Sequence, residues 1–227
     1  MNYAFAPTPI ISIPVMSSDP FPVRRIYCVG QNYAAHAREM GSDAGREAPF
    51  FFTKPAQAVL PNHAVMPYPP GTSDLQHEVE LVVALSRGGR DIPLDKANAH
   101  IFGYAVGLDM TKRDVQRTAR GQGRPWDMSK GFDYSAPCTA ITPTLRTGVI
   151  TKGKIELKVN GETRQSSDVD DMIWTIPEII NYLSQQVELY PGDLIFTGTP
   201  AGVGAVVKGD LIEATIAGLE ALVITIG

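Results

Sequence analysis

The chain has 227 residues, 44% of them hydrophobic and 19% charged, with a formal net charge of −4. These values are those of an ordinary globular protein with a large core, and they give no reason to expect nucleic acid or an anionic membrane as a partner. No apolar run approaches the roughly 18 residues of a membrane helix, and the proline-broken N-terminus lacks the basic region of a secretory signal. Cys28 and Cys138 form no CxxC pair, so we expect no disulfide framework and a cytoplasmic protein.

The N-terminal 22 residues contain five prolines and little periodicity, which predicts an extended arm or a short edge strand. We therefore divide the chain into an N-terminal arm over residues 1–22 and one domain over residues 23–227. The domain opens with a strand candidate, RRIYCV (24–29). Asn32 follows a glycine turn and is placed to cap a short helix, NYAAHAREM.

His36 and Glu39 lie three residues apart on this helix and are therefore neighbours on its surface. Two interpretations stay open. One is an exposed ion pair, which is common at this spacing; the other is a dyad in which the carboxylate orients an imidazole that acts as a general base. The next segment, GSDAGRE (41–47), is polar and contains glycine, so the helix is a candidate for a mobile lid.

Two glutamates open the apolar run HEVELVVAL (77–85), whose β-branched residues predict a strand. Glu78 and Glu80 point to one face of that strand, where apolar side chains follow, so two like charges stand at the edge of a core. Such a pair is costly unless a cation lies between the carboxylates. Asp109 ends a second predicted strand (102–109) and supplies a third oxygen donor. We therefore expect a hard divalent cation at these three carboxylates.

The same alternation places His77 on the opposite face of the strand. We do not assign it as a metal ligand, and we expect it to orient a neighbour or to pack.

One region of this acidic protein is basic: a polar stretch with helical propensity (111–120) and the glycine-containing stretch after it. Its cationic residues are Lys112, Arg113, Arg117, Arg120, Arg124 and Lys130. Nucleic-acid binding would need interleaved aromatic residues, and only Trp126 is present, so we do not expect it. The default interpretation is a solvated charged face. The alternative is that some of these residues bind an anionic substrate beside the cation, since arginine suits carboxylates.

The last third of the chain is rich in strands and turns. KIELKV (154–159) and residues 162–165 predict a hairpin, closed by Asn160-Gly161 in a type I′ turn. Residues 175–189 predict the clearest helix, with its first residue as N-cap. GTPAGVG (198–204) does not match GxxxxGK[ST] and opens no helix, so it predicts a turn that lines a site and not a phosphate loop.

Seven motifs follow one another from about residue 24 to the C-terminus. They are IYCVGQNYAAHAREMG, FFTKP, HEVELVVAL, GYAVGLDMTKRDVQ, GRPWDMSKGFDYSAP, LKVNGETRQSSDVDDMIWTIPEIINYLS and PGDLIFTGTPAGVG. Together, and in this order, they resemble the fumarylacetoacetate hydrolase family, far more specifically than one carboxylate pair does. The resemblance implies a mainly β (α+β) fold, a rolled mixed sheet with short peripheral helices, and a homodimer.

The resemblance also implies roles for individual residues. The metal ligands for Mg²⁺ or Mn²⁺ are Glu78, Glu80 and Asp109. The catalytic residues are His36 and Glu39, on a lid helix that activates water, and Lys130. The residues near the substrate are Lys54, Arg113, Gln116 and Thr199. Gln31 is a departure, because the family commonly has Arg there (VGRNY) just before the lid, and it bears on substrate carboxylate binding or lid closure.

The implied activity is metal-dependent hydrolysis of a C–C bond in a 2,4-diketo acid, an acylpyruvate. The expected reaction is 3-fumarylpyruvate plus water to fumarate plus pyruvate, a step of gentisate-type aromatic degradation, and a different acylpyruvate is an equal alternative. The same site can serve oxaloacetate decarboxylation or keto–enol isomerisation, which need a metal-stabilised enolate but no attack by water. Outside enzymes, the competing class is a non-catalytic metal-binding β domain, which has no use for a His36–Glu39 dyad.

Overall fold

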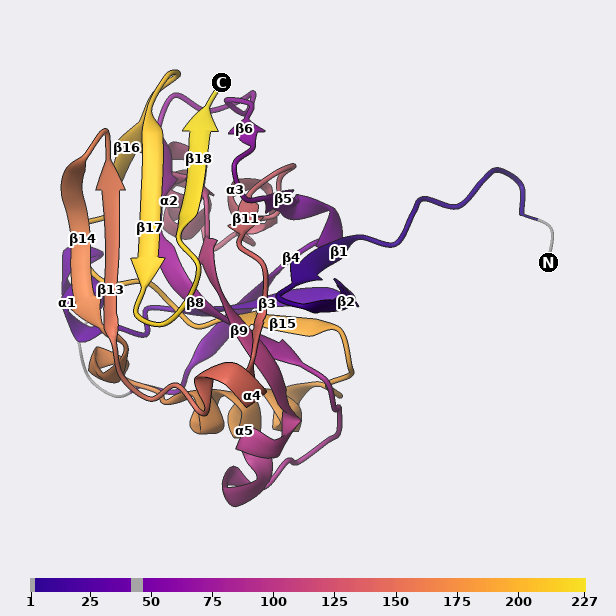
Figure 1. Ribbon diagram of the computed structural model, residues 1–227. Helices are drawn as coiled ribbons and strands as arrows, with labels where there is room; N and C mark the ends of the chain where they lie inside the picture. The colour runs from indigo at the N-terminus through magenta and orange to yellow at the C-terminus, as the bar shows by residue number, and fades with distance from the viewer. Residues whose placement is uncertain (1–2, 42–46) are drawn as a thin grey trace.

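The computed structural model describes residues 3–41 and 47–227, and it is built mainly of β-strands rolled around a core, with short helices at the periphery (Figure 1). The largest sheet has eight strands and mixes parallel with antiparallel pairs. Along it lie β4 (Phe50–Lys54), β3 (Arg25–Gly30), β15 (Asp193–Phe196), β8 (Val79–Leu85), β9 (Ile101–Leu108), β11 (Ala136–Cys138) and β5 (Val59–Pro61), while β12 (Thr142–Pro143) pairs with β9. The rolled mixed sheet with short peripheral helices that the sequence predicts is confirmed.

A second sheet has five strands and stands beside the first (Figure 1). Its order is β14 (Glu162–Asp168), β13 (Lys154–Val159), β17 (Leu211–Ile216), β18 (Leu222–Ile226) and β6 (Val65–Met66). The predicted hairpin joins β13 to β14, and its turn residues Asn160 and Gly161 have φ of 52° and 80°. Positive φ at both positions is what a type I′ turn requires.

The centre of the fold is β8, because every residue of this strand is buried. Its alternate side chains belong to two separate apolar clusters: Leu81 and Val83 face the cluster shared with the five-stranded sheet, whereas Val82 and Ala84 face the cluster shared with the N-terminal hairpin. A strand covered on both faces is a rigid base, so residues at its end are held in place.

A small sheet and short helices surround these two sheets. The three-stranded sheet contains β10 (Thr111–Lys112), β7 (Leu75–His77) and β16 (Gly204–Val206). The helices are α1 (Ala34–Glu39), α2 (Arg113–Gly121), α3 (Asp127–Lys130), α4 (Thr144–Thr147) and α5 (Ile176–Gln186), with 3-10 turns η1 (Ala56–Ala58), η2 (Leu94–His100) and η3 (Val169–Asp171). Within the described ranges, no helix is long and apolar enough to cross a membrane.

The predicted C-terminal helix is confirmed as α5, although it ends at Gln186, three residues earlier than expected. Its N-cap is Thr175, whose backbone N–H donates to Glu178 at 2.9 Å. This contact satisfies one of the free N–H groups of the first turn.

For the N-terminal segment the sequence offers an extended arm or a short edge strand, and the structure has short strands in residues 12–22. Strands β1 (Ser12–Val15) and β2 (Ser18–Pro22) form an antiparallel hairpin. Ile13, Val15 and Phe21 are buried in the second apolar cluster, and only the part before the hairpin extends away from the body (Figure 1). Proline is tolerated in β1 because Pro14 takes part in the contact at its outer edge as an acceptor: the Ile141 N–H donates to the Pro14 carbonyl at 2.8 Å, which needs no N–H from proline.

Replacement of Ile13 by alanine tests whether the hairpin belongs to the folded core. Ile13 is 1% exposed, so its truncation should lower the free energy of unfolding by about 2–4 kcal/mol. Ile10, which is 78% exposed, is the matched control, and Ile10→Ala should change it by less than about 0.5 kcal/mol. Urea denaturation measures the free energy of unfolding of both variants. A change for Ile13→Ala as small as that for Ile10→Ala would mean that the packing of the hairpin contributes nothing to stability.

Candidate metal centre and active site

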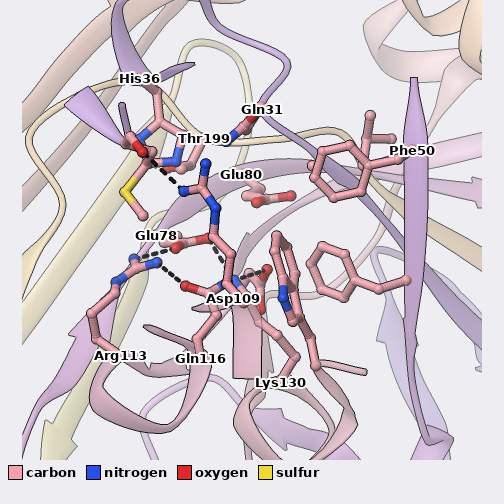
Figure 2. Close-up of a pocket in the computed structure, with 16 residues that line it drawn as sticks. Gln31, His36, Phe50, Glu78, Glu80, Asp109, Arg113, Gln116, Lys130 and Thr199 are labelled. Carbon is pink, nitrogen blue, oxygen red and sulfur yellow. Dashed lines mark hydrogen bonds and ion pairs between the residues drawn. The ribbon is translucent and has the colours of Figure 1, made fainter. Parts of the chain in front are cut away.

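Three carboxylates meet at the end of the β8–β9 pair. Glu78 immediately precedes β8 and Asp109 immediately follows β9, and the antiparallel register sets their neighbours Val79 and Leu108 opposite each other. The Asp109 N–H donates to the Glu78 carbonyl at 2.9 Å, which continues the ladder by one step. Glu80 lies two residues further along β8, on the same face as Glu78. The three side chains offer oxygen atoms that all lie within 4.8 Å of one another, and all three are buried (Figure 2).

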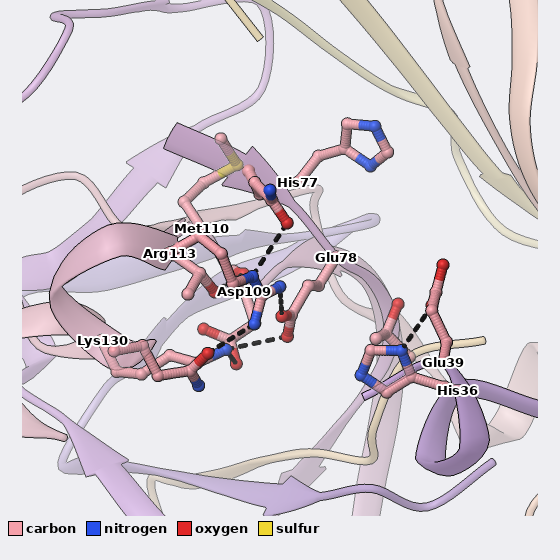
Figure 3. A network of polar contacts seen from close by, with 12 residues as sticks. His36, Glu39, His77, Glu78, Asp109, Met110, Arg113 and Lys130 are labelled. Carbon is pink, nitrogen blue, oxygen red and sulfur yellow. Dashed lines mark hydrogen bonds and ion pairs between the residues drawn. The ribbon is translucent and has the colours of Figure 1, made fainter. Parts of the chain in front are cut away.

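Three buried cations contact two of these carboxylates, and Figure 3 shows two of the cations, Lys130 and Arg113. Lys130 Nζ lies 2.8 Å from Glu78 Oε2 and 2.6 Å from Asp109 Oδ2. Arg113 donates to Glu78 Oε1 at 2.5 Å. Lys54 Nζ lies 2.8 Å from Asp109 Oδ1, but not in hydrogen-bonding geometry, so that oxygen has no hydrogen-bond donor within the described ranges.

The contacts push the pKa values of the two glutamates in opposite directions. Burial disfavours the charged form of Glu78, but the positive charges of Lys130 and Arg113 outweigh it and hold the pKa of Glu78 below its usual range. Burial, reinforced by the negative charges of Asp109 and Glu78, raises the pKa of Glu80 well above its usual range. The hydrogen bond that Glu80 accepts from the Gly198 N–H, at 2.8 Å, opposes this shift only in part. Among the residues that the structure describes, no cationic side chain contacts Glu80.

Gly198 allows that contact. Its φ is +97°, and a Cβ atom there would lie 2.6 Å from the Cβ of Asn32. Only glycine combines this backbone angle with so close an approach.

A divalent cation fits this donor set. All three ligand groups are carboxylates, and a hard ion such as Mg²⁺ or Mn²⁺ prefers oxygen. Asp109 Oδ1 is buried without a hydrogen-bond donor, and the charged form of Glu80 is uncompensated. A bound cation would supply what both groups lack. The two glutamates and the aspartate that the sequence singles out are therefore brought together as expected.

The His36–Glu39 pair is formed across the pocket from the carboxylates (Figure 3). His36 Nδ1 lies 3.0 Å from Glu39 Oε2 on α1. His36 is 5% exposed and lines the pocket, so the exposed ion pair is the wrong alternative for the imidazole. Glu39 also accepts from the Gly202 N–H at 3.1 Å. That contact ties α1 to the turn after β15. Most of the polar segment 41–47, on which the prediction of a mobile lid rests, lies outside the described residues.

Four further predicted residues line the same pocket: Arg113, Gln116, Lys130 and Thr199 (Figure 2). Arg113 donates to Gln116 Oε1 at 2.5 Å, which leaves the amide N–H groups of Gln116 as its donors toward the pocket. Gln31 lines the pocket too, with φ of 56°. Lys54 differs from the expectation, because it does not line the pocket: it lies behind Asp109 and donates to the carbonyls of Met110 and Lys130.

Asn32 does not cap α1. The N-cap is Tyr33. The buried Asn32 amide instead donates to the carbonyls of Trp174, at 3.0 Å, and Thr197, at 2.8 Å, and its oxygen accepts from the Trp174 N–H at 2.7 Å. These contacts position the start of the helix against β15, so tertiary hydrogen bonds replace the local one that the sequence favours.

Sequence reasoning missed one wall of the pocket, which is aromatic. Phe50 and Phe52 of β4 meet Trp126 with ring centroids 5.5 Å and 5.8 Å apart. Arg120, named in the basic region but not assigned to the site, also lines the pocket and donates to the Met40 carbonyl at the end of α1, at 2.9 Å. The available sequence signal for the aromatic wall was the FFF run of β4, whose first and third residues lie on one face of the strand. No local pattern distinguishes Arg120 from the other basic residues of its segment.

Residues 25–227 match the model of the fumarylacetoacetate (FAA) hydrolase C-terminal family. A fumarylpyruvate hydrolase from a Ralstonia species is 46% identical over 185 residues, which cover 82% of this chain and 96% of the relative. A mitochondrial oxaloacetate tautomerase from Arabidopsis thaliana is 43% identical over 196 residues, which cover 86% and 87%. The crystal structure of fumarylpyruvate hydrolase from Pseudomonas aeruginosa, in complex with Mn²⁺ and pyruvate, is 51% identical and superimposes with a TM-score of 0.97 over 99% of both chains. The chain belongs to the fumarylacetoacetate hydrolase family.

Proposed function

We propose that the protein hydrolyses the C–C bond of an acylpyruvate, with 3-fumarylpyruvate as substrate and fumarate and pyruvate as products. The observation that carries this proposal is the position of the His36–Glu39 dyad, which shares one pocket with the buried carboxylate triad. A metal-binding module needs only the triad. A dyad beside it supplies a base for a reaction that consumes water.

The charges of the site favour a doubly anionic substrate. Three buried cations (Lys54, Arg113 and Lys130) contact Glu78 and Asp109, and together with Glu80 the three carboxylates equal the cations in number, so the formal charges of these six groups sum to zero. A divalent cation would leave two positive charges in a pocket with little access to water. Fumarylpyruvate carries two carboxylates and restores neutrality, which avoids the cost of burying unpaired charge.

The residues around the pocket suit the bond cleavage. A Mg²⁺ or Mn²⁺ ion held by Glu78, Glu80 and Asp109 would act as a Lewis acid toward the 2-oxo acid end of the substrate. His36, with Glu39 behind it, takes a proton from water, and the water oxygen attacks the distal carbonyl carbon. The bond between C3 and C4 then breaks, its electron pair remains on C3 as pyruvate enolate, and protonation of C3 gives pyruvate while the acyl group leaves as fumarate.

Hydrogen-bond donors face the oxygens that become negative. Lys130 is charged, because the carboxylates of Asp109 and Glu78 outweigh burial and raise its pKa. Its ammonium, with the Gln116 amide and the Thr199 hydroxyl, stabilises developing oxyanion charge. Arg113 and the two lysines keep the triad in place. In this proposal Lys54 supports Asp109 and does not contact the substrate.

We further infer Mg²⁺ or Mn²⁺ as the metal, a homodimer as the assembly and the cytoplasm as the location. The oxygen-only donor set supports the metal, and the Pseudomonas relative was crystallised with Mn²⁺. The family resemblance supports the homodimer, and the reduced, unpaired Cys28 and Cys138 support the location.

The test is a substrate panel assayed for pyruvate release with Mg²⁺ and with Mn²⁺. Fumarylpyruvate should be hydrolysed faster than acylpyruvates with a neutral acyl group, because only the former balances both charges. Chelation of the metal should abolish turnover, and added Mn²⁺ should restore it. Turnover of oxaloacetate without any turnover of fumarylpyruvate would contradict the proposal.

Oxaloacetate keto–enol isomerisation is the second candidate, and the similarity to the Arabidopsis tautomerase favours it. Decarboxylation of oxaloacetate would use the same metal-stabilised enolate. Neither reaction requires attack by water. Monitoring the enol absorbance and pyruvate release in parallel separates the three activities, since isomerisation releases no pyruvate.

A further inference from the structure

We infer that Gln165, which lies outside the pocket, is a positioning residue that makes the Thr199 hydroxyl a hydrogen-bond donor toward the bound anion. The inference rests on the proposed function for the identity of that anion, the 2-oxo acid. It concerns a residue on β14, in the five-stranded sheet, that no local pattern links to the carboxylates.

The Gln165 side chain is fully buried and its amide is fully bonded. Its oxygen accepts from the backbone N–H of Val79 at 3.1 Å and lies 3.0 Å from His77 Nδ1. Its nitrogen donates to the Pro200 carbonyl and to Thr199 Oγ1, both at 2.8 Å. The Val79 N–H can only donate and the Pro200 carbonyl can only accept, so the orientation of the amide is unambiguous.

The orientation of Gln165 decides the role of Thr199. Because the Gln165 nitrogen donates to Thr199 Oγ1, the hydroxyl is an acceptor in that contact and its own hydrogen is left over. No protein acceptor for this hydrogen occurs in residues 3–41 and 47–227. Thr199 is 2% exposed and lines the pocket, so the hydrogen is available to an anionic oxygen there.

Gln165 also contacts His77, which precedes Glu78 in the chain and is not one of the three carboxylates. The Gln165 oxygen only accepts, so His77 Nδ1 carries the hydrogen in this contact. His77 and Val79 flank Glu78 in the chain, and both hold the same amide oxygen. One side chain thus connects the carboxylate strand to the turn that carries Thr199.

The experiment measures the binding of two probes separately: Mn²⁺ to the metal-free protein, and oxalate, a planar dianion that resembles pyruvate enolate, to the Mn²⁺-loaded protein. Isothermal calorimetry is applied to wild type, Gln165→Met, Thr199→Val and the double variant. Each single variant should weaken oxalate binding about tenfold through the loss of one hydrogen bond to a charged group. The double variant should be no weaker than Thr199→Val, because Gln165 acts through Thr199.

Mn²⁺ affinity should stay within about twofold of wild type in all three variants, because no metal ligand changes. A general structural role for Gln165 predicts the opposite: additive losses of oxalate affinity, or a parallel fall in Mn²⁺ affinity. Either result overturns the inference. Thr199→Ser keeps the hydroxyl and should bind oxalate like wild type.

Two control variants match the substitutions. Thr139→Val removes a buried hydroxyl that does not line the pocket, and Gln185→Met changes an exposed glutamine; neither should alter oxalate binding. If Gln165→Met does not fold, Thr199→Val still decides, since unchanged oxalate affinity in that variant overturns the inference. If the wild type binds Mn²⁺ and oxalate but cleaves no acylpyruvate, the proposed function is contradicted. The oxalate affinities of the variants still test the role of Gln165 in that case.

Discussion

Replacing Glu80 with glutamine should abolish tight metal binding and most turnover while leaving the metal-free protein as stable as wild type or more so. Replacing Glu78 with glutamine should abolish the same two functions and also destabilise the fold. The contrast follows from the cation contacts. Glu78 is bonded to Arg113 and Lys130, whereas Glu80 accepts a hydrogen bond from the Gly198 N–H and contacts no cationic side chain of residues 3–41 and 47–227.

The expected magnitudes come from this difference. Neutralising a buried, paired carboxylate leaves its partners Arg113 and Lys130 buried without their counter-charge. Glu78→Gln should therefore lower the free energy of unfolding of the metal-free protein by about 3 kcal/mol. Glu80→Gln removes a carboxyl group that no cation compensates and whose pKa is already raised by burial and by the charge of Asp109. Its effect on unfolding should therefore be zero or stabilising. Loss of Lewis-acid stabilisation should reduce turnover roughly 10²- to 10³-fold in both variants.

Urea denaturation after chelation measures stability, and calorimetric titration with Mn²⁺ measures affinity. Glu162→Gln is the control, because that side chain is 70% exposed and forms its ion pair with the exposed Arg164. Equal destabilisation by the two active-site variants would show that Glu80 has a partner that compensates its charge. Undiminished Mn²⁺ affinity and turnover in either variant would remove that residue from the metal site.

Local periodicity was enough to predict part of this site. The two-residue repeat of a strand sets Glu78 and Glu80 on one face and His77 on the other, and the structure agrees. The approach of Asp109 depends on the pairing of β8 with β9, which a strand pattern alone does not determine. Gln165 arrives from a different sheet, and no spacing rule connects it with Thr199.

The basic segment shows where charge patterns stop being informative. Arg113 and Arg117 are four residues apart on α2, yet the Arg113 side chain is 4% exposed and the Arg117 side chain 72%. Helical spacing sets such residues on nearby faces, and only the position of the helix against the carboxylates decides which one is buried. Both interpretations of this segment are therefore correct for different residues: Arg113 and Lys130 lie in the site, and Arg117 is solvated.

Replacing His36 with alanine should reduce hydrolysis of fumarylpyruvate by roughly 10²- to 10⁴-fold, the range for loss of a general base. Mn²⁺ affinity should not change, because His36 lies on α1 and is not one of the three carboxylates. Alanine favours the helix, so the free energy of unfolding should fall only by the lost packing of one imidazole. Pyruvate release, Mn²⁺ titration and urea denaturation measure the three quantities.

Two comparisons make the result specific to water activation. Glu39→Gln keeps a side chain that can bond His36 and the Gly202 N–H but removes the charge, so its effect should be smaller, about tenfold. His63→Asn is the control for a histidine outside the pocket: His63 is exposed and has φ of 62°, an angle that asparagine accepts. Any isomerisation of oxaloacetate should persist in His36→Ala, since that reaction needs no attacking water. Full hydrolytic activity in His36→Ala would mean that another group activates the water, and the dyad would then serve only to hold α1 to the turn at Gly202.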